Sequence, residues 1–199
     1  LYGVNLKESL QMNLALDIPI SFRNDGESAI VGEAIYGAGK VYKRLVGITL
    51  GTGFGSAFII NGKPHFEGEG IPKKLPLYDC VWKNQRVDDI FSIRGLMSRL
   101  ASLGFYDNPK QAVNEAKNNS QIRNVFEAWG DDLGQFLNAS ISSFKAQALI
   151  VQGGLSGGME YFAKSLQRNL SARVVKHSLG SKAALLGASD AFNEQYGSI

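Results

Sequence analysis

Asn24-Asp25-Gly26 is the first segment of the chain whose residue types suggest chemistry. It follows a β-like run, Ile18–Phe22, and precedes a predicted helix over Glu27–Tyr36. An aspartate at the end of a strand can lie exposed at the sheet edge and act as a general base toward a substrate hydroxyl. Asn24 can hydrogen-bond a neighbouring hydroxyl. The alternative is that Asp25 only caps the helix, since aspartate is a preferred N-cap residue.

A glycine-rich segment, Gly51-Thr52-Gly53-Phe54-Gly55, separates two apolar runs, Leu45–Leu50 and Ser56–Ile60. Glycines carry no side chain, so their backbone N–H groups can approach an anion closely, and the Thr52 hydroxyl can donate as well. The segment is therefore a candidate phosphate-binding loop. An ordinary glycine-rich hairpin or bulge would explain the same residues.

A second glycine-rich segment, Gly153–Gly158, follows the apolar run Ala148–Gln152 and precedes a predicted helix over Met159–Leu170. Strand, glycine turn and helix form a layout that holds nucleotides at the carboxyl end of a sheet. A tight strand-to-helix connection is the alternative. The segment after Leu50 lacks the G-x-G-x-x-G spacing of a dinucleotide site, and the glycines at 37 and 39 do not complete a Walker loop.

The elements that must position these residues alternate between strands and helices. Asn61-Gly62 is a strong hairpin signal after the second strand, and Glu67–Asn84 is expected to be a loop. Leu6–Leu16 is a short amphipathic stretch, and Pro64–Phe66 is strand-like. Helices are expected over Asp88–Leu103, Asn108–Lys117, Ser120–Lys145 and Lys182–Tyr196, and a strand over Ala172–Lys176. This order predicts an α/β fold with a mixed sheet and helices packed on it.

The composition is that of a globular protein. The chain has 199 residues, of which 44% are hydrophobic and 20% charged, and this excludes a disordered or collagen-like chain. The net charge of +3 is too small and dispersed to indicate nucleic acid or an anionic membrane. A single cysteine, Cys80, excludes an internal disulfide and favours a reducing, cytoplasmic setting. His65 and His177 have no partners at metal-ligand spacing.

Taken together, the motifs resemble the ROK family, which contains bacterial sugar kinases such as glucokinases and fructokinases and also sugar-responsive repressors. The segments that carry the resemblance are SFRNDGESAIVGEA at 21–34, LGTGFG at 50–55, VQGGLS at 151–156 and LGSKAALLGA at 179–188. They occur in the family's order and run through most of the chain.

The resemblance implies an actin-like, ribonuclease-H-like ATPase fold and transfer of the γ-phosphoryl group of ATP to a hexose hydroxyl, with Mg²⁺. It gives Asp25 the place of the catalytic general base, and Asn24, Glu69 and Asp88 the places of sugar-binding residues. The nucleotide-binding residues that it implies are Gly51, Thr52, Gly53, Gly153, Gly154 and Gly187. The implied partners are a hexose and ATP, in a cytoplasmic protein that can form a homodimer and needs no membrane.

Two departures from the family pattern qualify this expectation. The family's N-terminal Asp-x-Gly-Gly-Thr hairpin has no counterpart here, so we expect residues 1–199 to be a C-terminal kinase-like domain, inactive without an N-terminal lobe. Gly68-Glu69-Gly70-Ile71-Pro72 stands where many members carry Gly-Glu-x-Gly-His followed by zinc-binding cysteines. Since Cys80 stands alone there, we expect no zinc.

The alternative function within the same resemblance is a sugar-responsive repressor without kinase activity. No helix-turn-helix is visible in these 199 residues. Such a protein would therefore bind DNA through a segment outside them. Asp25 and the two glycine segments favour the kinase, because phosphoryl transfer needs an acceptor-side base and groups that position phosphates.

Overall fold

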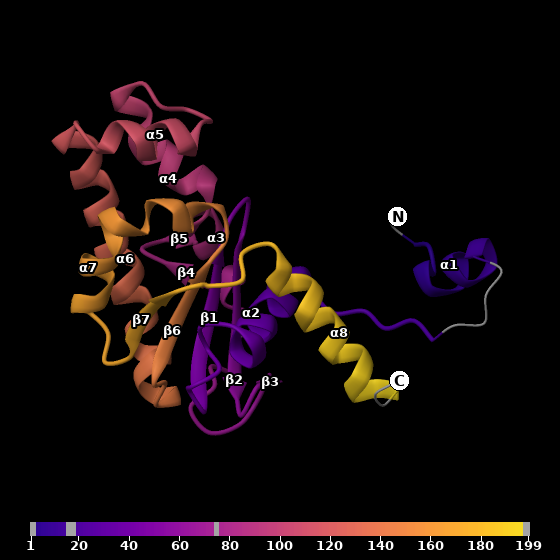
Figure 1. The fold of residues 1–199 in the computed structure, drawn as a ribbon. Helices are drawn as coiled ribbons and strands as arrows, with labels where there is room; N and C mark the ends of the chain where they lie inside the picture. The colour runs from indigo at the N-terminus through magenta and orange to yellow at the C-terminus, as the bar shows by residue number, and fades with distance from the viewer. Residues whose placement is uncertain (1–2, 15–18, 74–75, 197–199) are drawn as a thin grey trace.

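A five-stranded mixed sheet with the strand order β3-β2-β1-β6-β7 forms the centre of the fold in the computed structural model, which describes residues 3–14, 19–73 and 76–196 (Figure 1). Its strands are β1 (Arg44–Leu50), β2 (Phe54–Ile60), β3 (Lys63–His65), β6 (Ala148–Gln152) and β7 (Arg173–Lys176). β1 pairs in parallel with β6, and β6 with β7, whereas β2 is antiparallel to both of its neighbours. The carboxyl ends of β1 and β6 therefore meet at one edge of the sheet.

Helices cover both faces of this sheet (Figure 1). One face carries α6 (Ser120–Phe144) and α7 (Met159–Arg168), with the shorter α3 (Val87–Phe91), α4 (Ile93–Leu100) and α5 (Pro109–Ala116). The other face is covered by α2 (Asp25–Tyr36), and α8 (Lys182–Tyr196) packs on α2. α1 (Leu6–Leu14) lies apart from the sheet and has no buried residue. Among the described residues, no helix is long and apolar enough to cross a membrane.

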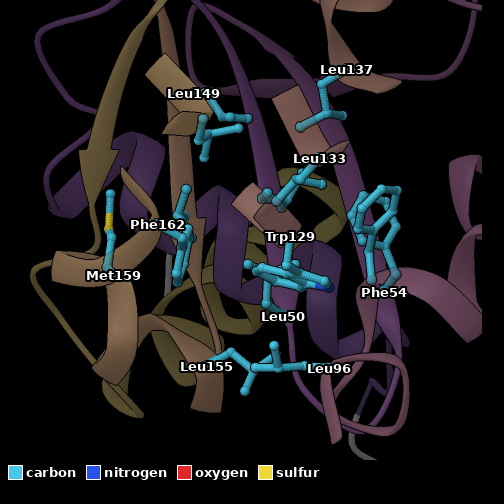
Figure 2. Packing of buried hydrophobic residues seen from close by; sticks show 14 of the residues in the cluster. Leu50, Phe54, Leu96, Trp129, Leu133, Leu137, Leu149, Leu155, Met159 and Phe162 are labelled. Carbon is cyan, nitrogen blue, oxygen red and sulfur yellow. The ribbon is translucent and has the colours of Figure 1, made fainter. Parts of the chain in front are cut away.

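The larger of two hydrophobic clusters lies between the sheet and α6 (Figure 2). Trp129 is fully buried in it, and its indole N–H donates a hydrogen bond of 2.9 Å to the carbonyl oxygen of Ile90. That bond satisfies the one polar atom that the tryptophan brings into the core. It also ties α3 to α6. The smaller cluster packs Ile30 of α2 against Leu45 and Ile150 on the other face.

The periodicity of the sequence predicted most of these elements, and the mixed α/β fold is confirmed. Pro109 begins α5 as the first-position proline predicted, with Asn108 as its cap. The apolar pattern of 120–145 is the helix α6, which ends where Lys145 adopts a left-handed conformation with φ of 54°.

Three sequence predictions were wrong in whole or in part. The β-like run Ile18–Phe22 is no strand over residues 19–22, and Ile18 lies outside the described residues. The helix expected over Asp88–Leu103 is broken at Ser92, whose extended backbone ends α3 and whose side chain caps α4 by accepting from the Gly95 N–H. The loop expected over 67–84 contains β4 (Val81–Trp82), which pairs with β5 (Gln85–Arg86).

Candidate active site at the carboxyl edge of the sheet

A cleft of about 1030 Å³ opens where β1 and β6 end. Its walls come from the first turn of α2, the turn between β1 and β2, the strand β3 with the loop that follows it, and the end of β6. The predicted site residues that line it are Asn24, Asp25, Gly51, Thr52, Gly53, Asp88 and Gly153. Residues far apart in the sequence are thus brought to one edge of the sheet, as the parallel pairing of β1 and β6 requires.

The sequence left open whether Asp25 caps the helix or exposes its carboxylate, and in the structure Asn24 is the cap. Asn24 is the N-cap residue of α2, and its side-chain oxygen accepts a hydrogen bond of 3.1 Å from the N–H of Glu27. Asp25 is the first helical residue, and its Oδ1 accepts from the N–H of Gly26 at 2.8 Å. Because Asn24 supplies the cap, the exposed carboxylate of Asp25 is left on the wall of the cleft.

The turn between β1 and β2 presents backbone groups to the same cleft. Within the turn, the N–H of Gly51 donates to the carbonyl oxygen of Gly53 at 3.1 Å. A Cβ at Gly51 would meet nothing closer than 4.0 Å, so the space beside this residue is open. Thr52 at the tip is exposed. A ligand phosphate can therefore approach Gly51 and the Thr52 hydroxyl without displacing protein atoms.

Gly153 connects β6 to the second glycine turn in a conformation that favours glycine, with φ of 96°. A Cβ there would lie 2.5 Å from the carbonyl oxygen of Leu50, so glycine is needed for the end of β6 to approach β1. Gly154, the next residue, is outside the main cleft. It lines a separate hollow of about 210 Å³ together with Lys110 and Asn114 of α5.

The structure does not bring Glu69 or Gly187 into the cleft. Glu69 lies near the opposite end of the sheet, where its carboxylate is 3.0 Å from the ammonium group of Lys145 at the end of α6. That pair is exposed, and the hydrogen bond from Lys145 lowers the pKa of the Glu69 carboxyl. Gly187 lies in the contact between α8 and α2, against the backbone of Ser28.

Gln152 is a cleft residue that the sequence reasoning missed. It ends β6, is only 7% exposed, and its Nε2 donates to the carbonyl oxygen of Gly180 at 3.4 Å. Its Oε1 has no hydrogen-bond partner in the part of the chain that the structure describes. The sequence signal for this residue was its polar side chain at the end of an otherwise apolar strand, Ala148–Gln152. His65 also lines the cleft, from β3.

Glu27, in the first turn of α2, is a second acidic residue on the wall near Asp25. Burial raises the pKa of the Glu27 carboxyl, and the Arg23 guanidinium, 3.3 Å away, opposes this shift. In residues 3–14, 19–73 and 76–196 no three or more His, Cys, Asp or Glu side chains gather into a group that could hold a metal ion. Mg²⁺ in phosphate-transferring sites needs no such group, because it is usually held by one or two carboxylates together with substrate phosphates.

Comparison with known proteins bears on the family resemblance and on the fold. The sequence model of the ROK family matches residues 2–75, which include Asp25 and the first glycine turn. The resemblance to the ROK family is confirmed. The structure of a sugar kinase from Cytophaga hutchinsonii, described as putative, superposes with a TM-score of 0.78 at 23% identity, covering 96% of this chain and 70% of that one. The fold is thus the actin-like ATPase fold of ROK sugar kinases.

The proteins to which this chain is similar include both kinases and repressors. A ROK family glucokinase from Streptomyces griseus, solved with glucose and AMPPNP, gives a TM-score of 0.73 at 25% identity over 94% of this chain and 71% of that one. The xylose repressor of Bacillus subtilis is 23% identical over 209 residues, which cover 94% of this chain and 53% of the repressor. The chain therefore spans about half the length of that repressor.

Proposed function

We propose that this ROK chain forms the base-bearing and nucleotide-facing part of an ATP-dependent sugar kinase. The observation that carries the proposal is that the Asp25 carboxylate and the glycine turns at Gly51 and Gly153 line one cleft. Phosphoryl transfer needs such a juxtaposition, because the acceptor hydroxyl and the phosphate must be held in line, with a base beside the hydroxyl. The Streptomyces griseus glucokinase, solved with glucose and AMPPNP, supports the same reaction class.

In this proposal Asp25 accepts the proton of the sugar hydroxyl while the hydroxyl oxygen forms a bond to the γ-phosphorus. The bond from that phosphorus to the β,γ-bridging oxygen breaks, and ADP leaves. The side-chain amide of Asn24 can donate to a neighbouring sugar hydroxyl. The backbone N–H groups of the turns and the Thr52 hydroxyl hold phosphate oxygens. Mg²⁺, which is usually held by one or two carboxylates together with substrate phosphates, would neutralise phosphate charge.

The proposal extends to the domain organisation. This chain covers 71% of the Streptomyces griseus glucokinase and 53% of the xylose repressor. We propose that residues 1–199 act as a C-terminal kinase-like domain and that a second lobe completes the cleft around the sugar and the phosphates. Closure of two lobes would exclude water and limit hydrolysis of ATP. On this view residues 1–199 alone bind the sugar and ATP weakly and have little kinase activity.

A sugar-responsive repressor is the second candidate function. It is favoured by the match to the xylose repressor, which extends over 94% of this chain. A sensor of this kind would keep the sugar contacts of the cleft without productive phosphoryl transfer. The two functions differ in one measurable property, which is turnover of ATP in the presence of a bound sugar.

The deciding experiment measures ATP-dependent phosphorylation by the complete protein across a panel of hexoses and amino sugars. Asp25→Asn is the test variant, and Asp89→Asn, an exposed aspartate beside the cleft residue Asp88, is the matched control. We expect turnover on at least one sugar, abolished in Asp25→Asn but kept in Asp89→Asn, with sugar binding by calorimetry retained in both. Sugar binding without turnover in the parent protein would favour the repressor. If Asp25→Asn lost both sugar binding and turnover, Asp25 would be a structural or binding residue.

A further inference from the structure

Asp88, in the first turn of α3, uses its two carboxylate oxygens for two different partners. Oδ1 accepts a hydrogen bond of 2.7 Å from the backbone N–H of Phe54. Oδ2 lies 3.2 Å from the guanidinium group of Arg94. The Asp88 side chain is only 20% exposed. One oxygen is thus engaged by the residue that ends the first glycine turn, and the other by a cation on α4.

The segment that carries Asp88 holds the same turn at two further points. The N–H of Ile93, just after α3, donates to the carbonyl oxygen of Gly51 at 2.8 Å. The ring of Phe91 lies 6.3 Å from the ring of Phe54, which is 3% exposed. α3 is itself fixed to α6 by the hydrogen bond of Trp129. The turn is therefore fastened at its beginning and at its end to one buried segment.

The glycines of the turn are explained by this attachment. A Cβ at Gly53 would lie 3.0 Å from Oδ1 of Asp88, which is tighter than side chains normally tolerate. A Cβ at Gly51 would instead face open space. Gly53 thus leaves room for the carboxylate of Asp88, whereas the space beside Gly51 is open.

We propose that Asp88 is a positioning residue that holds the Gly51–Gly53 turn in shape for phosphate binding. The inference rests on the proposed function for the role of the turn, and it gives Asp88 a role different from the sugar contact that the family resemblance implies. Without Asp88, the N–H of Phe54 loses its acceptor at a site where water has little access. The end of the Gly51–Gly53 turn is then no longer held by the carboxylate.

The test compares Asp88→Ala, Asp88→Asn and Asp89→Ala in the complete protein. Asparagine keeps an oxygen that can accept from the Phe54 N–H but removes the charge, whereas alanine removes the acceptor. Asp89 is the matched control, because it shares the partner Arg94 but, among the described residues, has no hydrogen bond or ion pair with the turn. We expect Asp88→Ala to raise the KM for ATP about tenfold and Asp88→Asn to stay within about threefold of the parent. The KM for the sugar should change less than about twofold in both variants, and Asp89→Ala should match the parent.

A direct sugar contact would give the opposite result. In that case Asp88→Asn and Asp88→Ala would both raise the KM for the sugar and leave the KM for ATP unchanged, and this outcome would overturn the inference. Unchanged kinetics in Asp88→Ala would overturn it as well.

Hydrogen exchange at the Phe54 amide separates this inference from the proposed function, since it needs neither substrate nor turnover. We expect exchange to be about tenfold faster or more in Asp88→Ala, and close to the parent rate in Asp88→Asn and Asp89→Ala. If the parent protein showed no kinase activity but the exchange pattern held, the proposed function would fail while the positioning role of Asp88 stood. If exchange at Phe54 did not change in Asp88→Ala, the positioning role would fail whatever the activity.

Discussion

Gly187 of α8 lies against α2 so closely that a Cβ on it would overlap the carbonyl oxygen of Ser28. Gly32 of α2 makes the reciprocal approach, with the carbonyl oxygen of Ala183 in the place of its missing side chain. Arg23 adds a hydrogen bond of 2.9 Å to the carbonyl oxygen of Gly187. The two helices therefore approach each other through backbone, and glycine at both positions makes this possible.

Gly187→Ala should destabilise the protein by about 1–3 kcal/mol, because the added methyl must push α8 away from α2. The substitution improves intrinsic helix propensity by up to about 1 kcal/mol, so a loss of stability can only come from the contact. Gly157→Ala is the control, since a Cβ there would meet nothing within 4 Å. Denaturant unfolding of the three proteins gives the comparison. Equal stability of Gly187→Ala and the parent would contradict the close contact.

Patterns of local spacing predicted much of the fold. The apolar periodicity of 120–145 and the small-residue run after Ser181 each gave a helix that the structure contains, because one face of a packed helix repeats every three to four residues. The glycine clusters after Leu50 and Gln152 predicted the two turns, since each interrupts a run of buried strand residues. These elements could be predicted because the residues that determine each helix or turn lie within or directly beside it in the sequence.

Features that depend on distant partners could not be predicted in this way. The run Ile18–Phe22 has strand composition, but strand formation also depends on pairing with a distant segment, and residues 19–22 are not assigned to a strand of the sheet. Phe54, whose N–H donates to Asp88, is 34 residues away from it in the sequence, and Lys145, the partner of Glu69, is 76 residues away from Glu69. The role of Gly187 is set by a helix at the other end of the chain.

The Thr52 hydroxyl is proposed to contact phosphate, and Thr52→Val tests this at nearly constant side-chain shape. We expect the KM for ATP to rise about threefold to tenfold, which corresponds to the loss of one hydrogen bond. Sugar binding should stay at the parent level. Thr52→Ser, which keeps the hydroxyl, should behave as the parent does. An unchanged KM for ATP in Thr52→Val would remove Thr52 from the phosphate site.

Glu69→Gln should leave the KM for the sugar unchanged, although the family resemblance places a sugar-binding carboxylate near this position. Its ion pair with Lys145 lies outside the cleft, with 83% of the Glu69 side chain exposed, and such exposed pairs contribute little to stability. Asn24→Ala is the comparison, because Asn24 lines the cleft, and it should weaken sugar binding. A large increase in the sugar KM of Glu69→Gln would show that the loop around Glu69 rearranges when the sugar binds.

His177 joins the loops that follow β6 and β7 through a chain of hydrogen bonds. The hydroxyl of Ser156 donates to the carbonyl oxygen of Gly153 at 2.6 Å and lies 2.9 Å from Nε2 of His177. Nδ1 of His177 accepts from the N–H of Gly180 at 3.2 Å. These bonds assign a neutral imidazole with its proton on Nε2, which donates to Ser156. Both loops lie beside the cleft, so their relative position depends on this link.

The link predicts that His177→Ala and Ser156→Ala are not additive. Each substitution removes the same hydrogen bond, so the second should cost less once the first is present, with a coupling of about 0.5–3 kcal/mol in the free energy of unfolding. His177→Ala paired with a substitution at the exposed Lys176 is the control cycle and should show additive effects within about 0.5 kcal/mol. Additive losses for the first pair would mean that each side chain acts through separate contacts. The loops beside Gly153 and Gly180 would then be positioned independently of each other.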